Sequence, residues 1–314
     1  MPRARAPDHV PVLLAEVVDA LAPRAGGRYV DCTFGRGGHA RALLERIGGD
    51  GRLLVIDRDP LAVAAAAAMA AGDARLTVVH ETFARLGEVA ARAGLMGKVD
   101  GIVLDLGLSS PQLDDAGRGF SFRHDAVLDM RMDPGTGESA AAWLERATEA
   151  EIADVIHRYG EERHARRIAR AIVASRARAP IRTTRELADL VVRALPRGRA
   201  RDKHPATRTF QAIRMHVNGE HDALASALAA TPAVLAPGGR LAVVSFHSLE
   251  DRMVKRFIRD SFRPRTLPRG LPVTGDPPGG VLRPIGRARR PHEREIAANP
   301  RARSAVLRVA ERLP

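Results

Sequence analysis

Apolar and polar positions along the chain predict strands separated by helices. Short β-rich runs bounded by Gly, Pro or Asp predict strands that end at Asp31 and Asp57, followed by strands at 76–80, 99–106 and 240–246. The alanine-rich stretch 59–71 is typical of a crossover helix, because alanine is the best helix former. This repetition predicts an α/β fold with a doubly wound parallel sheet.

The interval between Asp105 and the strand that begins at Arg240 is far too long for one crossover. Capping boxes at Thr148 and Thr183 predict helices within it. A helical stripe of apolar residues also lies there, formed by Ala165, Ile168, Ala169, Ile172 and Val173. We therefore expect an inserted all-α domain at 135–216, between a first part of the sheet domain at 1–134 and a second part at 217–314.

The second part of the sheet domain contains a basic loop that is rich in Pro and Gly. Residues 263–294 have the composition of an extended loop. Residues 304–309 alternate weakly and predict a final antiparallel edge strand. A helix is expected to begin at Ser248, with Asp251 completing its capping box.

A glycine-rich turn follows the first predicted strand and precedes a helix. Gly35, Gly37 and Gly38 allow backbone amides to approach a ligand closely, and Asp57 is placed to accept hydrogen bonds from ribose hydroxyls. Dinucleotide sites have a third glycine where this chain has Ala40. The turn therefore favours S-adenosylmethionine, with Asp31 as a candidate acceptor for its ammonium group.

Charge and cysteine content narrow the class of protein. The formal net charge of +13 favours a polyanionic partner, and nucleic acid is the preferred one. The single cysteine, Cys32, lies in a predicted strand, and the histidines lack metal-ligand spacing, so we expect neither disulfides nor a metal. No stretch has the length of a membrane span, and we expect a soluble cytoplasmic protein.

Asp105 is the candidate catalytic residue. It ends the central predicted strand, at the edge where ligands bind in such sheets. An exocyclic amine on a base is a poor nucleophile because its lone pair is conjugated with the ring, and a carboxylate that accepts one of its N–H bonds would direct that lone pair at a methyl group. The alternative, that Asp105 holds the cofactor or caps the turn, is left open.

Four residues are candidates for substrate binding. Arg131 lies in a segment that mixes aromatic and charged residues, and Arg208 ends a basic linker with Arg197, Arg199, Arg201 and Lys203. His247 and Arg252 flank the start of the predicted helix after the last parallel strand. Each of these side chains can equally have a structural role or lie in solvent without binding a substrate.

Several motifs together resemble one family closely: TFGRGGHA, LDLGLSSPQLDD, LDMRMDP, HPATRTFQA, SFHSLEDR and NPRARS. The chain resembles the MraW family of bacterial ribosomal RNA small subunit methyltransferases, over about residues 9–311. The resemblance implies an S-adenosylmethionine-dependent enzyme with a Rossmann-like sheet that methylates the exocyclic N4 amine of a decoding-centre cytidine in 16S rRNA. It implies cofactor contacts at Gly37, Gly38, His39, Asp57, Phe83, Asp105 and Gln112.

Three other functions have less support in the sequence. A nicotinamide-dependent dehydrogenase lacks support, since the third glycine and an evident set of hydride-transfer residues are missing. A non-catalytic RNA-binding assembly factor would be expected to have lost the glycine turn. A DNA amino-methyltransferase would usually have a Pro-Pro-aromatic turn where this chain has Ser109, Ser110 and Pro111. The sequence does not distinguish naked RNA from an assembled ribosomal subunit as the substrate, and it leaves the oligomeric state open.

Overall fold

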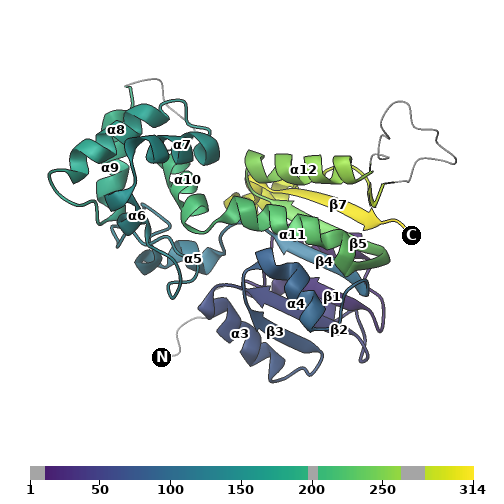
Figure 1. Cartoon of the computed structure of the whole chain (residues 1–314). Helices are drawn as coiled ribbons and strands as arrows, with labels where there is room; N and C mark the ends of the chain where they lie inside the picture. The colour runs from purple at the N-terminus through teal and green to yellow at the C-terminus, as the bar shows by residue number, and fades with distance from the viewer. Residues whose placement is uncertain (1–10, 197–203, 263–279) are drawn as a thin grey trace, which may run out of the picture. The chain divides into compact units, whose positions relative to one another are not determined.

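The computed structural model describes residues 11–196, 204–262 and 280–314. These residues divide into two compact units. The first, the sheet unit, contains the chain up to Gly107 and again from Asp222, and the second, the helical unit, spans Leu108–His221. Figure 1 labels most of the helices and strands of both units.

The described part of the sheet unit contains one sheet of seven strands in the order β3-β2-β1-β4-β5-β7-β6. The bounds are β1 Arg28–Asp31, β2 Arg52–Asp57, β3 Leu76–His80, β4 Val99–Asp105, β5 Leu235–Ser245, β6 Leu282–Pro284 and β7 Val306–Arg312. Strands β1 to β5 pair in parallel, whereas β7 is antiparallel to both β5 and β6. The predicted parallel sheet and its Rossmann-like class are confirmed.

Helices cover both faces of the sheet, so its central strands are buried on each side. Their bounds are α1 Leu14–Leu21, α2 Gly38–Leu44, α3 Pro60–Ala70, α4 Leu86–Arg92, α11 Glu220–Val234, α12 Ser248–Phe262 and α13 Glu293–Ala298, with 3₁₀ turns at Phe83–Arg85 and Pro300–Ser304. In β2, Leu53 and Val55 pack with α1, α2 and α3, whereas Leu54 and Ile56 pack with α4, α11 and α12. This two-sided burial explains the continuous apolar run.

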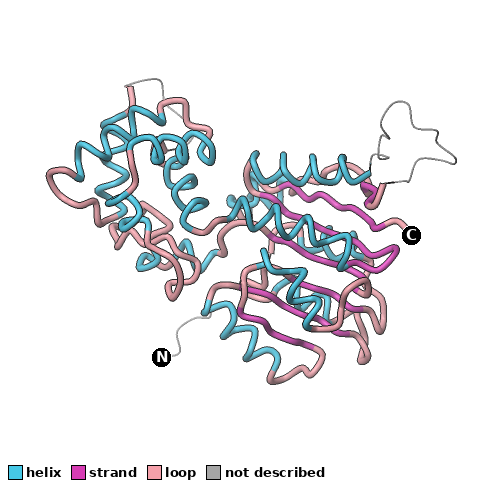
Figure 2. Tube along the Cα trace, in the orientation of Figure 1, coloured by secondary structure: helices cyan, strands magenta, loops and turns pink. Residues whose placement is uncertain are grey.

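The helical unit is built from α5 Ser110–Asp114, α6 Ala140–Arg146, α7 Glu149–Gly160, α8 Ala165–Arg176, α9 Thr184–Ala194 and α10 Thr207–Val217, with a 3₁₀ turn at Ala116–Arg118. Figure 2 shows these helices in cyan, joined by loops. Both predicted capping boxes are present, at Thr148 with Glu151 and at Thr183 with Glu186. The predicted stripe on α8 packs into the core of this unit, around Trp143 and Phe210.

The compact helical unit is longer than the inserted domain that we expected at 135–216. It begins at Leu108 because Phe120, Leu128, Met130 and Met132 are buried in the same core as the helices. A composition-based boundary cannot find this, since residues 108–134 contain little regular structure and yet pack against helices far along the sequence.

The end of the chain differs from the sequence-based prediction. Strand β7 is not at the edge, because β6 pairs along its outer side. Leu282 of β6 is completely buried, so this part of the Pro-rich and Arg-rich segment is a packed strand and not a loop. Residues 263–279 and the linker residues Arg197, Arg199, Arg201 and Lys203 lie outside the described residues.

We predict that Ile168→Ala destabilises the helical unit by about 2–5 kcal/mol, because the Ile168 side chain is completely buried and its loss leaves a cavity. Trp143 is the single tryptophan of the chain and lies in this core, so its fluorescence reports on the helical unit alone. The urea midpoint of that fluorescence should fall for Ile168→Ala and hardly move for Arg166→Ala, which changes an exposed residue of the same helix. Equal midpoints for the two variants would contradict this packing.

Candidate functional site

Three aspartates lie at the carboxyl ends of adjacent parallel strands. Asp31 ends β1, Asp57 ends β2 and Asp105 ends β4. Strand β1 lies between β2 and β4, so the three strand ends share one stretch of the sheet edge. In open α/β sheets, ligands bind outside this edge.

The glycine turn between β1 and α2 is tightly packed. Gly37 has φ of +73°, and a Cβ there would lie 2.6 Å from the Phe34 ring and 2.8 Å from the Met69 side chain. At Gly38 a Cβ would lie 2.1 Å from Pro11. Only glycine satisfies both the backbone conformation and the space at Gly37, so the turn depends on this residue type.

Asp57 fixes the glycine turn to the second strand. Its Oδ2 accepts a hydrogen bond from the Gly35 N–H at 2.8 Å, and its Oδ1 accepts one from the Asp59 N–H at 2.9 Å. Burial raises the pKa of the Asp57 carboxyl, and these backbone donors partly oppose that shift. Each carboxylate oxygen has a second lone pair, so the same group can also accept from ribose hydroxyls.

His39 lies between acidic groups at the start of α2. Its Nε2 is 3.5 Å from the Asp105 Oδ2, and the His39 side chain is only 4% exposed. Burial by itself would lower the pKa of His39, but Asp105 and Asp31 together raise it. Asp31 is completely buried, and desolvation raises its pKa to about 6 although the Thr33 N–H donates to its Oδ1.

Several buried polar atoms of this cluster have no hydrogen-bond partner among the described residues. They are Asp31 Oδ2, Asp105 Oδ1 and both ring nitrogens of His39. Unsatisfied buried polar atoms are rare in native proteins and mark places where a ligand or water binds. Acceptors beside a glycine turn fit the ammonium group and ribose hydroxyls of S-adenosylmethionine.

The family model of the MraW methylases matches residues 6–313. The chain belongs to the MraW methylase family. It is 60% identical, over 98% of either chain, to a Thioalkalivibrio sulfidiphilus protein named ribosomal RNA small subunit methyltransferase H. A Chromohalobacter salexigens protein of the same name is 58% identical over 97% of this chain and 92% of its own. Membership confirms the resemblance noted in the sequence, and it makes the chain an S-adenosylmethionine-dependent methyltransferase.

In this MraW methylase, a second polar group follows β5. The His247 Nε2 lies 3.0 Å from the Glu250 Oε1, and the other oxygen of Glu250 accepts from the Phe246 N–H at 3.0 Å. Asp105 pairs in register with Val244, so this group begins at the strand next to Asp105. Sequence reasoning named His247 and missed Glu250, although their spacing of three residues on a helix start was the available signal.

Asp251 forms an ion pair with β7, and the capping box that the sequence predicted for it stays a prediction. Its carboxylate oxygens accept from Arg308 of β7 at 2.7 and 3.0 Å. Arg252, the other candidate on α12, is exposed. Its predicted role in substrate binding stays a prediction.

Three predicted site residues lie in the helical unit: Gln112, Arg131 and Arg208. Gln112 is buried on α5, and its Oε1 accepts from the Ser109 N–H at 2.9 Å. Arg208, at the start of α10, donates to the Glu161 carbonyl at 3.1 Å. The cofactor role of Gln112 and the substrate role of Arg208 stay predictions.

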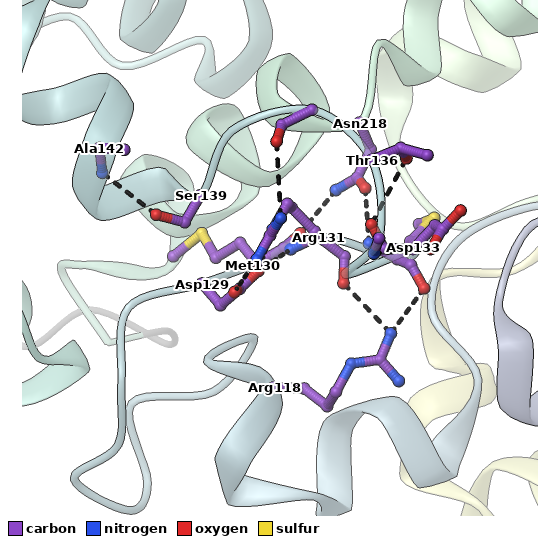
Figure 3. A network of polar contacts seen from close by, with 12 residues as sticks. Arg118, Asp129, Met130, Arg131, Asp133, Thr136, Ser139, Ala142 and Asn218 are labelled. Carbon is purple, nitrogen blue, oxygen red and sulfur yellow. Dashed lines mark hydrogen bonds and ion pairs between the residues drawn. The ribbon is translucent and has the colours of Figure 1, made fainter.

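Arg131 is held in a loop stabilised by buried polar contacts, which Figure 3 shows. Its guanidinium pairs with the Asp129 carboxylate at 2.7 and 2.8 Å. Asn218 bonds the loop on both sides of Arg131, donating to the Met130 carbonyl and accepting from the Met132 N–H, each at 2.7 Å. Met130 has φ of +64°, an unfavourable value for this residue type, so the loop is held in a strained conformation.

Phe83 begins the 3₁₀ turn after β3 and packs partly buried against the α4 side of the sheet. Its predicted cofactor contact came from the family motif alone, since an aromatic residue after a strand does not by itself indicate a cofactor site.

Within the described residues, no group of His, Cys, Asp and Glu could hold a metal ion, and no helix is long and apolar enough to cross a membrane.

We predict that Asp31→Asn stabilises the cofactor-free protein at pH 7.5. The Asp31 pKa is raised from 3.8 to about 6, so the folded state binds the proton more tightly and loses stability as pH rises through this window. Two pKa units correspond to about 3 kcal/mol, which the Asn variant should regain above pH 6 and not below pH 4.

Urea denaturation followed by circular dichroism at pH 4 and pH 7.5 measures this difference. Asp50→Asn, which neutralises an exposed carboxylate, is the matched control and should show little change at either pH. A variant that is less stable than the parent at pH 7.5 would show that the Asp31 charge is compensated in the folded protein.

Proposed function

We propose that the chain methylates the exocyclic N4 amine of a decoding-centre cytidine in 16S rRNA. The relatives named ribosomal RNA small subunit methyltransferase H support rRNA of the small subunit as the substrate. A net charge of +13 is suited to such a polyanion. Because ribosomal subunits are assembled in the bacterial cytoplasm, we expect the enzyme to act there.

One observation supports the amine as target: Asp105 ends β4 with a buried Oδ1 that has no partner among the described residues. Such an oxygen can accept one N–H bond of an amine. This contact would reduce conjugation of the nitrogen lone pair with the ring and direct it toward the electrophile. A ring carbon would need activation by a covalent nucleophile, and the thiol of Cys32 is buried in the sheet.

S-adenosylmethionine supplies an electrophilic methyl group on a positively charged sulfur. In the proposed reaction the amine nitrogen forms a bond to the methyl carbon, and the carbon–sulfur bond breaks with its electron pair going to sulfur. The nitrogen loses one proton, which Asp105 or water accepts. Asp57 and the glycine turn hold the nucleoside part of the cofactor, and the acidic edge favours its positive charges.

Two roles for Asp105 are compatible with its position, cofactor binding and orientation of the amine. The His39 Nε2 lies 3.5 Å from the Asp105 Oδ2, and the raised pKa of His39 favours the positive form of the imidazole at this position. A role in cofactor binding alone would change the affinity for S-adenosylhomocysteine. A role in orienting the amine would change the rate at saturating cofactor.

We predict that Asp105→Asn lowers methyl transfer by roughly 10²-fold or more at saturating cofactor, because the neutral amide is a weaker acceptor for the amine. The measurement uses S-adenosylmethionine with a labelled methyl group and small-subunit particles from cells that lack the enzyme. Digestion to nucleosides should place the label on N4-methylcytidine.

Glu45→Gln is the control, since it removes an exposed carboxylate from the end of α2 and should leave the rate unchanged. Naked 16S rRNA and DNA are offered in parallel to identify the form of substrate. Label on another nucleoside, or on DNA alone, would contradict the proposed target. A normal rate for Asp105→Asn would contradict its catalytic role.

A further inference from the structure

A groove lies at the β6 edge of the sheet, away from the aspartate cluster. It is bounded by the second half of α12 and by β6 with the turn that follows it, and its volume is about 220 Å³. We call it the edge groove and define it by Lys255, Arg259, Phe262, Ile285, Arg287 and Arg308. All of them belong to the sheet unit, in which Figure 1 shows α12 beside β7.

The floor of the edge groove is apolar. Ile258 of α12 and Val309 of β7 are buried at its base. Phe262 lines it with 46% of its surface exposed, so part of an aromatic ring is open to a partner. The volume is below the roughly 300–1,000 Å³ of pockets that enclose a whole drug-sized ligand, so the groove suits one flat ring of a larger partner.

The rim of the edge groove is basic, and none of its lining residues is acidic. Arg308 is paired with Asp251, and Arg259 is paired with Asp260 at 2.8 Å. Lys255 and Arg287 are exposed and form no ion pair with any described residue. Two unpaired cations next to an apolar floor with an exposed aromatic ring match a nucleotide, which presents a phosphate beside a flat base.

We propose that the edge groove binds a nucleotide of the RNA substrate other than the methylated one. The base lies on Phe262 and the apolar floor, and the adjacent phosphates contact Lys255 and Arg287. This inference rests on the proposed function, since it assigns a second contact to the same RNA.

The sheet order separates the edge groove from the site of methyl transfer. Strand β6 is three strands from β4, which ends in Asp105, and strands lie about 4.8 Å apart, so the two are separated by roughly 14 Å. A contact at that distance adds affinity for RNA and does not touch the reacting atoms. Its loss should therefore raise KM and leave kcat unchanged.

The test uses the full-length protein and a fluorescein-labelled 12-nucleotide single-stranded RNA, with Kd measured by anisotropy over a range of salt concentrations. Phe262→Ala should raise Kd about tenfold without changing its salt dependence, because stacking involves no counterion release. The double variant Lys255→Glu with Arg287→Glu should raise Kd and reduce the slope of log Kd against log salt by about 0.7 for each lost phosphate contact. Arg256→Glu makes the same kind of charge change on α12 outside the groove and should bind like the parent.

Two further measurements, methyl transfer and competition by poly-glutamate, separate the outcomes. Methyl transfer to small-subunit particles should show a raised KM and a normal kcat for the groove variants. If the parent protein transfers methyl groups and the groove variants keep the parental Kd and KM, the groove inference is overturned while the proposed function stands. If the parent transfers no methyl group to RNA, the proposed function itself fails. Poly-glutamate is offered as a competitor of the RNA. If it displaces the RNA, and if Phe262→Ala weakens its binding as much as it weakens RNA binding, the occupant is an acidic protein and the inference is overturned.

Discussion

The parallel alignment of β1, β2 and β4 forces three carboxyl groups onto one buried edge of the sheet. Burying these groups is unfavourable, and the pKa of Asp31 shows it, because desolvation raises that pKa to about 6 with a smaller contribution from the charges of Asp105 and Asp57. The positive form of His39, which Asp31 and Asp105 favour, offsets part of this unfavourable energy. We propose that a cationic ligand with several hydrogen-bond donors lowers this energy further when it binds, so that the buried carboxylates favour S-adenosylmethionine as the cofactor.

The rest of the site follows from this arrangement. Asp57 connects the second strand to the glycine turn through the Gly35 N–H, so the turn and the acidic edge are a single unit. Gly37 cannot be replaced without a clash against Phe34 and Met69, which fixes the turn close to the strand ends. Beyond β5, His247 and Glu250 form a further polar group next to the same edge. Substrate contacts farther away, such as the edge groove, then need to contribute only affinity.

Much of the fold and of the candidate site could be predicted from the sequence because it depends on local patterns. The apolar runs, the acids that end them and the helical capping boxes gave the strands, the edge and the inserted helices. Contacts between distant residues could not be predicted. Leu282 is buried through pairing of β6 with β7, and Asp251 holds Arg308 across 57 residues, so neither was visible in a local pattern. The start of the helical unit at Leu108 depends likewise on long-range packing.

Calorimetric titration of the purified protein with S-adenosylhomocysteine and with NADH, with Asp57→Ala alongside, tests whether the three aspartates and the glycine turn bind S-adenosylmethionine. We expect one S-adenosylhomocysteine bound per chain, no binding of NADH, and an affinity for S-adenosylhomocysteine lowered at least tenfold in the variant. Equal binding of NADH, or an unchanged affinity in Asp57→Ala, would contradict this assignment.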